Sequence, residues 1–170
     1  NTLTGAHGGL TLNTATGAWS YTLANDQTLS ANDSLTDTFT VTVTDDKGLA
    51  ATVTKDIVVT VKGTNDAPQI SSTSSTVARE VQEDGTVTVS GQVVASDVDH
   101  DAVLSYSANT LTGAHGGLTL NTATGAWSYT LANDQTLSAN DVFTETFTVT
   151  VTDDKGLAAT VTKDIVVTVK

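Results

Sequence analysis

The chain repeats itself at a spacing of 108 residues, and this repeat constrains its fold more than any other feature. Residues 1–62 align with residues 109–170 without a gap, and 59 of the 62 aligned pairs are identical. The pairs that differ are Ser34 and Val142, Leu35 and Phe143, and Asp37 and Glu145. A period of this length matches one β-sandwich domain rather than a solenoid coil. The sequence therefore predicts tandem copies of one domain, and such near-identity favours a longer array.

The alternation of side chains indicates that the repeated domain is all-β. Apolar residues alternate with Thr or Ser in Trp19–Leu23 and in Phe39–Thr44, which turns one side of each strand toward a core. The many Thr and Val residues fit this interpretation, because β-branched side chains favour strands. Asn13–Gly17 separates two such runs and predicts a hairpin turn with a positive φ at Gly17. Lys55 falls on the apolar side of its strand, which predicts that the strand bulges or changes sheets near Lys55 and Asp56.

The segment that occurs only once, residues 63–108, supplies the remaining strands of a full period. Runs at Pro68–Ser71, Thr86–Val94 and Val103–Ser107 bring the total to about seven strands, the number in an immunoglobulin-like sandwich. The polar run Gly63–Pro68 is typical of a linker. The predicted domains are residues 1–62, the C-terminal part of one repeat; residues 63–68, the linker; and residues 69–170, a complete β-sandwich repeat.

Residues 1–62 lack counterparts of those additional strands, so they would expose an unpaired sheet edge and half of a core. Three explanations stay open at this point. This half takes strands from another molecule, or the true domain boundary is permuted, or residues upstream of Asn1 belong to the domain.

Charge and composition exclude several classes of function. The net charge of −12 comes from 19 acidic and 7 basic residues, whereas nucleic acids and anionic membranes are bound by clustered Lys and Arg. No apolar run reaches the length of a membrane span, so no membrane partner is expected. The chain has no Cys and hence no disulfide framework. A secreted domain of this kind depends on a good core or on metal ions.

Acidic residues gather in four kinds of segment between the predicted strands, one of which occurs in both copies of the repeat. Carboxylates on alternate residues of an extended loop point the same way and can converge on a hard cation, and Ca²⁺ takes about six to eight oxygen ligands. The alternative is that such residues are solvated and form turns, which is our interpretation of Asp26, Asp33 and Asp37. The candidate calcium ligands are Asp97, Asp99 and Asp101; Asn65 and Asp66 of the linker; Glu80, near Glu83 and Asp84; Asp45 and Asp46; and Asp153 and Asp154.

These segments resemble the VCBS repeat, which occurs in tandem along large RTX-type adhesins and biofilm proteins of Gram-negative bacteria. The resemblance rests on Trp19-Ser20-Tyr21, Phe39–Asp45, Ile57–Gly63 and Thr64-Asn65-Asp66-Ala67-Pro68. The chain is also similar to the cadherin repeat, through Asp46-Lys47-Gly48, Asp97-Val98-Asp99 and Asn65-Asp66.

The resemblance implies a Greek-key, cadherin-like sandwich with calcium within and between repeats, type I secretion to the bacterial cell surface, and an extended stalk. It also implies a ligand set at the junction between repeats. That set comprises Asn65, Asp66, Glu80, Asp97 and Asp99. The partners expected are adjacent repeats of the same chain, with strand exchange with another molecule as a further option.

The sequence thus predicts a structural extender of a secreted adhesin, stiffened by calcium, and no enzyme. His7 and His115 are one glycine-flanked loop position in two copies, with no nucleophile at a fixed spacing. The alternative is a module that binds carbohydrate or ice through threonine rows such as Thr40, Thr42 and Thr44. Threonine is also the ordinary outward residue of a half-buried strand, and we expect Trp19 and Trp127 to be core residues.

Overall fold

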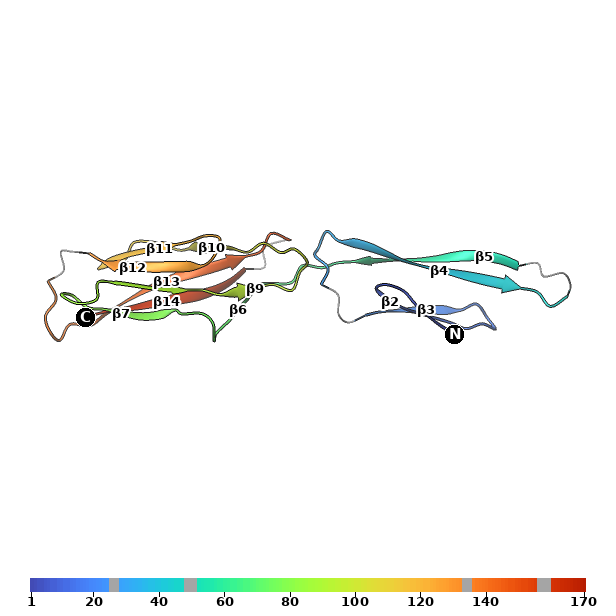
Figure 1. Ribbon diagram of the computed structural model, residues 1–170, viewed down its shortest axis with the longest axis horizontal. Helices are drawn as coiled ribbons and strands as arrows, with labels where there is room; N and C mark the ends of the chain where they lie inside the picture. Colours follow the sequence, from blue (N-terminus) through green and yellow to red (C-terminus); the bar gives the residue numbers. More distant parts are fainter. Residues whose placement is uncertain (25–27, 48–51, 133–135, 156–159) are drawn as a thin grey trace. The chain divides into compact units, whose positions relative to one another are not determined.

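The computed structural model describes residues 1–24, 28–47, 52–132, 136–155 and 160–170, and these form two compact units, Asn1–Thr64 and Asn65–Lys170. Strands and turns account for the described residues, without a helix, which confirms the predicted all-β class (Figure 1). Accordingly, nothing in the described ranges is a helix long and apolar enough to cross a bilayer.

Unit 2, residues Asn65–Lys170, is a sandwich of two main sheets. One sheet has the strand order β10-β13-β14-β7 and the other β11-β12-β8, while β6 and β9 form a small two-stranded sheet. β7 runs parallel to β14, and the other pairs are antiparallel. The strands are β6 (Gln69–Ile70), β7 (Ala78–Val81), β8 (Thr88–Gln92), β9 (Ala95–Ser96), β10 (Ser105–Ala108), β11 (Gly116–Leu120), β12 (Ala126–Leu131), β13 (Phe143–Thr152) and β14 (Thr160–Val169).

The core of unit 2 follows the predicted alternation. Trp127 and Tyr129 of β12 face Phe147 of β13 and Ile165 of β14 across the sandwich, and all four are buried. The intervening threonines face outward, because successive side chains of a strand point to opposite sides. Burying large aromatic and aliphatic groups from both sheets is the main source of stability for a sandwich of this kind.

Unit 1, residues Asn1–Thr64, has nearly the same sequence in residues 1–62 as unit 2 has in residues 109–170, but it contains fewer strands. Its sheets are β1-β2-β3 and β4-β5. The prediction that Trp19 is a core residue is wrong for this unit, because the side chain is 50% exposed whereas Trp127 is 3% exposed. The strands are β1 (Thr2–Thr4), β2 (Gly8–Leu12), β3 (Trp19–Leu23), β4 (Ser34–Thr44) and β5 (Thr52–Lys62).

The hairpin prediction is confirmed, and the prediction of a bulge or a change of sheet near Lys55 is wrong. Residues 13–18 join β2 to β3, with φ of 75° at Gly17, and Oδ1 of Asn13 accepts hydrogen bonds from the N–H groups of Ala15 and Thr16. β4 and β5, in contrast, pair in one continuous register that places Lys55 opposite Val41. Lys55 keeps the inward parity without a bulge because its side chain is exposed there, three residues from the start of β5 at Thr52.

Candidate metal centre

Two short strands bring the linker and the loop after β9 together at one end of unit 2. β6 pairs with β9 in antiparallel register, with Gln69 opposite Ser96. The residues just before β6 and just after β9 therefore lie side by side, and the N–H of Asp66 donates to Oδ2 of Asp99 at 2.9 Å. Asp153 reaches the same end because it follows the last residue of β13. Three separate segments thus place oxygen-bearing side chains in one group.

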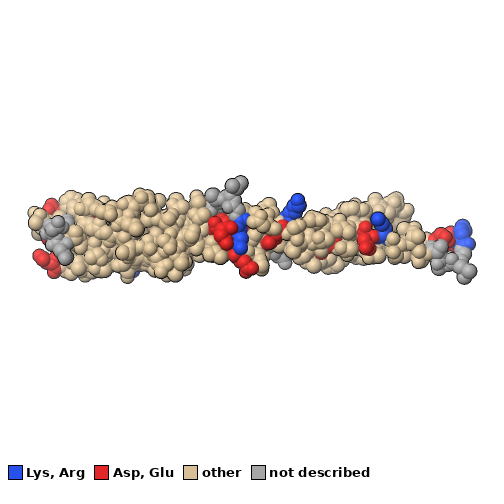
Figure 2. All heavy atoms as spheres, turned by 90° about the horizontal axis from the view of Figure 1, so that it is seen from above, with Lys and Arg blue, Asp and Glu red and all other residues tan. Residues whose placement is uncertain are grey.

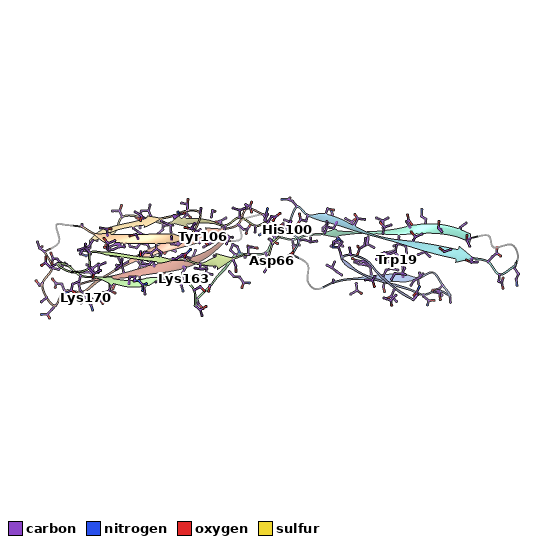
Figure 3. The ribbon with its side chains drawn as sticks, viewed as in Figure 1. Trp19, Asp66, His100, Tyr106, Lys163 and Lys170 are labelled. Carbon is purple, nitrogen blue, oxygen red and sulfur yellow. The ribbon has the colours of Figure 1, made fainter. Side chains whose placement is uncertain are left out.

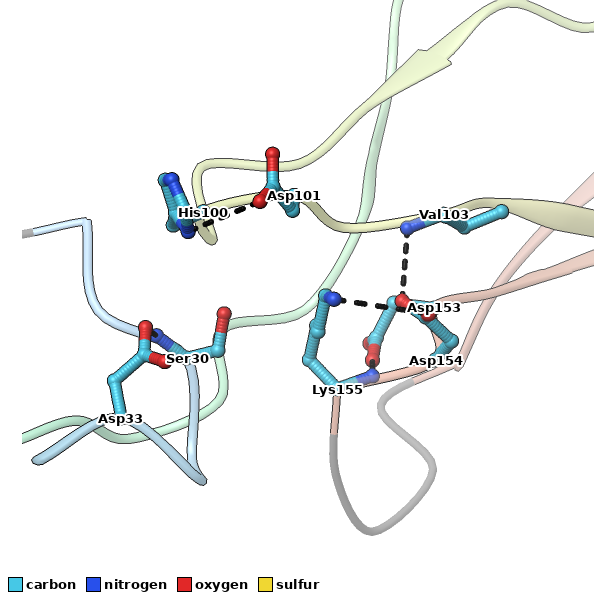
Figure 4. A network of polar contacts seen from close by, with 8 residues as sticks. All are labelled: Ser30, Asp33, His100, Asp101, Val103, Asp153, Asp154 and Lys155. Carbon is cyan, nitrogen blue, oxygen red and sulfur yellow. Dashed lines mark hydrogen bonds and ion pairs between the residues drawn. The ribbon is translucent and has the colours of Figure 1, made fainter.

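Hydrogen bonds fix the positions of these side chains. Nδ2 of Asn65 donates to Oδ2 of Asp153 at 3.2 Å, which ties the linker to the end of β13. The N–H of Asp99 donates to Oδ1 of Asp97 at 2.9 Å, so the two carboxylates of this loop are held close together. The other oxygen of Asp153 accepts the N–H of Lys155 at 2.7 Å (Figure 4). One oxygen of Asp97, one oxygen of Asp99 and both oxygens of Asp153 therefore accept hydrogen bonds that build the loops.

Three oxygen atoms of this group are buried and have no hydrogen-bond partner. They are Oδ1 of Asn65, Oδ2 of Asp97 and Oδ1 of Asp99. Asp99 and Asp153 are also nearly inaccessible, with 5% and 7% of their surface exposed. Leaving a buried polar atom without a partner costs about 1–3 kcal/mol, and more when the group is charged. A bound cation is the simplest group that satisfies several acceptors at once.

The environment of Asp99 disfavours its negative charge. Burial raises the pKa of the Asp99 carboxyl above its ordinary value, and the nearby carboxylates of Asp97, Asp66 and Asp153 raise it further. The hydrogen bond from the N–H of Asp66 acts in the opposite direction but is the weaker effect. A divalent cation beside these groups would reverse this balance, because it stabilises the ionised form of every carboxylate around it.

Carboxylates alone do not complete a site. Within the described ranges, no three His, Cys, Asp or Glu side chains converge closely enough to hold an ion by themselves. The unpartnered oxygens include the amide oxygen of Asn65, which is not a member of those residue types. Calcium accepts amide and carboxylate oxygens together and tolerates irregular geometry. The donor set of Asn65, Asp97 and Asp99, with Asp66 and Asp153 beside it, therefore fits calcium.

Two neighbouring carboxylates serve other purposes. Oδ1 of Asp154 accepts the N–H of Val103 at 2.8 Å, and this bond, followed by the charge of Lys155, holds the pKa of Asp154 below its ordinary value (Figure 4). Asp101 adopts a positive φ of 56° in its turn, and its carboxylate lies 3.4 Å from Nδ1 of His100 on the surface. The alternation of Asp97, Asp99 and Asp101 is broken at this turn, so Asp101 is not brought into the group.

Glu80 lies at the other end of unit 2. It is opposite Thr168 in the β7–β14 ladder, whereas Thr160, at the start of β14, is opposite Thr152 near Asp153. At about 3.3 Å per strand residue, the two positions are roughly 26 Å apart. Glu80 pairs there with Lys170 at 2.8 Å, and Figure 3 shows Asp66 and Lys170 at opposite ends of the unit. Glu80 therefore cannot share an ion with Asn65 or Asp99 of the same unit.

Acidic groups accordingly gather at the ends of unit 2, and its sheet face is nearly free of charge in the view of Figure 2. The second acidic end contains Glu80, Glu83 and Asp84 beside Leu137, whose N–H donates to Glu83. Asp45 and Asp46 belong to unit 1. There, Asp45 accepts the N–H of Lys47 at 2.9 Å, and Asp46 pairs with the ammonium group of Lys47 at 3.3 Å.

Asp37, which we interpreted as solvated, is a buried residue of unit 1. Its carboxylate accepts the N–H of Ala6 at 2.9 Å, the N–H of His7 at 3.1 Å and the hydroxyl of Tyr21 at 2.8 Å. The physical reason is its inward position on β4, two residues before Phe39. Asp37 precedes Phe39 by two residues on β4, so both side chains point to the same side of the strand, and this spacing is the feature of the sequence that indicates burial of Asp37.

Glu145 occupies the corresponding position in unit 2 and accepts the N–H of His115 and the hydroxyl of Tyr129. The longer side chain reaches the same partners, so one additional methylene is accommodated. A Cβ at Gly113 would approach the Glu145 carboxylate to 2.4 Å, which explains the glycine in this loop. The loop that contains His115 therefore surrounds the buried Glu145 carboxylate, and the backbone N–H of His115 donates a hydrogen bond to it.

The sequence profile of the bacterial cadherin-like domain matches residues 65–170, and that of the bacterial Ig domain matches residues 1–60. The first match covers unit 2 and the second lies within unit 1. No curated protein sequence matches the chain.

Solved structures that resemble the chain include cadherin ectodomains. Mouse clustered protocadherin PcdhgC3 EC1-3 is 20% identical, with a TM-score of 0.54, over 100% of this chain and 55% of that one. PcdhgB3 EC1-4 is 17% identical, with a TM-score of 0.50, over 99% and 40%. The chain thus spans about half the length of the first of these ectodomain fragments.

At such low identity, these structural neighbours establish the fold alone, a cadherin-like β-sandwich consistent with a Greek key. The sequence match is more specific, because it covers the whole of the complete sandwich, from the linker asparagine to the last strand. The chain belongs to the bacterial cadherin-like domain family.

Proposed function

We propose that this chain is a structural extender of a bacterial surface adhesin, a stalk segment that calcium stiffens at the ends of its repeats. The observation that carries the proposal is the set of three buried, unpartnered oxygens of Asn65, Asp97 and Asp99. Membership in the bacterial cadherin-like family supports an extracellular, adhesion-type module. We further propose that the chain is a VCBS-type repeat of a secreted RTX adhesin, and that this adhesin promotes attachment or biofilm formation.

Calcium would be held by residues from three segments. Asn65 and Asp66 come from the linker, Asp97 and Asp99 from the loop after β9, and Asp153 from the end of β13. A bound divalent ion supplies positive charge that neutralises the crowded carboxylates and cross-links the three segments. The loops are already hydrogen-bonded into position, so binding orders few additional groups. Magnesium is a poorer candidate, because it retains its waters and demands a regular octahedron.

A stalk function follows from the placement of the linker residues within this group. Unit 2 begins at Asn65, so a cation held by Asn65 and Asp66 restricts the start of this sandwich. Flexible linkers let an array of domains coil, whereas cross-linked ones do not. We therefore propose adjacent repeats of the same chain as the partners, the bacterial cell surface as the location, and no catalytic activity.

The test is thermal unfolding of the chain in 1 mM chelator and in millimolar calcium, with magnesium as the control. The ion binds only the folded unit, so we expect stabilisation of about 2.7 kcal/mol at a concentration 100 times the dissociation constant. Small-angle scattering under the same conditions reports whether calcium also changes the dimensions of the chain. Identical unfolding curves with chelator and calcium would overturn the proposal.

A second candidate function is supported by one observation on the outer face of the large sheet of unit 2. Thr150 lies opposite Thr162 and Thr152 opposite Thr160, and Ser105 of β10 is opposite Thr152. Hydroxyl groups are thus stacked across three neighbouring strands, as a surface that binds ice requires. The next row contains a charge, however, because Thr148 lies opposite Asp164 and donates to it. An ice-recrystallisation assay and a glycan array test this candidate directly.

A further inference from the structure

We propose that Asn32 is an acceptor for an N-linked sugar, and that this modification distinguishes unit 1 from unit 2. The acceptor motif is asparagine, then any residue except proline, then serine or threonine. Among the nine asparagines of the chain, Asn32 alone meets it, in Asn32-Asp33-Ser34. Such a motif is an acceptor only on a surface loop, where a transferase and a bulky sugar can both reach the amide group.

Asn32 lies in an exposed turn just before β4. The N–H of Asp33 donates to the carbonyl of Ser30 at 2.9 Å, and Oδ2 of Asp33 accepts the N–H of Ser30 at 2.9 Å. These two bonds hold the half-buried side chain of Asp33 against the turn and leave Asn32 exposed. Ser34, the first residue of β4, is exposed as well. The amide group and the hydroxyl group of the motif are therefore both accessible.

The equivalent turn of unit 2 shows that this exposure is a property of the repeat. There the N–H of Asp141 donates to the carbonyl of Ser138, and Oδ2 of Asp141 accepts the N–H of Ser138, both at 2.8 Å. Asn140, the counterpart of Asn32, is exposed too. Because unit 2 has the strands that unit 1 lacks, the exposed asparagine does not result from their absence.

The two turns differ in the last position of the motif. Unit 1 has Ser34, whereas its counterpart in unit 2, Val142, has no hydroxyl group. This pair is one of the three that differ among the 62 aligned pairs. Unit 2 thus presents the same asparagine in the same turn without the motif, and we expect Asn140 to stay unmodified.

The reaction transfers a sugar from an activated donor. Nδ2 of Asn32 attacks the anomeric carbon of a sugar that is linked to a diphosphate, carried by a nucleotide or by a lipid. The C–N bond forms as the C–O bond to the diphosphate breaks, and the diphosphate leaves with the electron pair of that bond. A base of the transferase takes the amide proton. The hydroxyl group of Ser34 serves in recognition by the transferase and does not accept the sugar.

The test incubates the folded full chain with a bacterial N-glycosyltransferase and UDP-glucose, or with an oligosaccharyltransferase and a lipid-linked oligosaccharide. Trypsin separates the two turns, because cleavage after Lys47, Arg79 and Lys155 leaves Asn32 in residues 1–47 and Asn140 in residues 80–155. Mass spectrometry should locate the sugar in residues 1–47 alone, and the donor that reacts identifies its source. An unmodified chain with both donors, under conditions that modify a synthetic acceptor peptide, would overturn the proposal.

Reciprocal substitutions test the role of the hydroxyl group. Ser34→Val should abolish the modification, Ser34→Thr should retain it, and Val142→Ser should add a second sugar at Asn140. Both substituted positions are exposed, Val142 by 58%, so we expect the variants to melt at the temperature of the parent chain. Modification of Asn32 in Ser34→Val, or an unmodified Asn140 in Val142→Ser, would contradict the assignment.

Discussion

The hydroxyl group of Tyr21 donates a 2.8 Å hydrogen bond to Oδ2 of Asp37 inside unit 1. Tyr129 and Glu145 form the same pair in unit 2, where the acid is longer by one methylene. In both units, a backbone N–H of the histidine loop completes the arrangement. Each buried acid therefore joins a strand, a neighbouring aromatic side chain and a loop.

Glu145→Gln should destabilise unit 2 by about 1–3 kcal/mol, because the amide retains an acceptor but places its NH₂ group near N–H donors. Urea unfolding followed by tryptophan fluorescence measures the change. Thr146→Gln, on the outward side of the same strand, is the matched control and should have little effect. A loss of the same size in the control would show that the acid has no special role.

The pH dependence of unit 1 should reflect Asp37. Burial raises the pKa of this carboxyl, but hydrogen bonds from Tyr21, His7 and Ala6 together outweigh burial, and the net pKa is below its ordinary value. A depressed pKa in the folded state contributes stability above the unfolded value of about 3.9 and loses it as the pH falls through the folded value. Acid should therefore destabilise unit 1 below about pH 4, and Asp37→Asn should flatten this part of the pH profile.

Asp99→Asn should raise the stability of unit 2 in chelator and abolish the response to calcium. The substitution removes a buried charge whose pKa the surroundings raise, and the amide can donate to the unpartnered oxygens around it. We expect a gain of about 1 kcal/mol without metal. Calorimetric titration with calcium and melting in chelator measure the two effects. Asp101→Asn is the matched control, and a loss of stability in chelator for Asp99→Asn would contradict the assignment.

Acidification should also weaken the effect of calcium on unit 2. The folded pKa of Asp99 is raised, so in chelator this group contributes stability at low pH and loses it as the pH rises through the folded pKa. Protons and calcium thus compete for the same carboxylate. The calcium-induced shift in melting temperature should shrink as the pH falls toward the raised pKa. A shift independent of pH would place the ion elsewhere.

Gly113→Ala should destabilise unit 2 by about 1–3 kcal/mol, because the new methyl group would overlap the Glu145 carboxylate. Gly117→Ala, in the adjacent strand, is the control. Its Cβ would lie 3.6 Å from the nearest atom, which is an ordinary contact. Chemical unfolding of the two variants compares them, and equal stabilities would mean that the loop moves aside without cost.

The sequence was sufficient to predict the all-β class and the facing pattern of β12, β13 and β14, because period-two alternation directly reports which side of a strand is buried. Short strands without such alternation, namely β1, β7 and β9, were not predicted. The grouping of Asn65 with Asp97 and Asp99 depends on the β6–β9 pairing, which no local pattern reveals. Glu80 was assigned to that group through the resemblance to known repeats, because the order of residues in a sequence does not reveal at which end of the sandwich a residue lies.

The parallel pairing of β7 with β14 determines how unit 2 would respond to tension. Pulling its first residues away from its last ones slides these two strands past each other along their length. The hydrogen bonds of the β7–β14 ladder, which runs from the pair Ala78 and Val166 to the pair Val81 and Val169, then bear the force together instead of breaking one after another. Force along the chain therefore meets its greatest resistance in one short ladder.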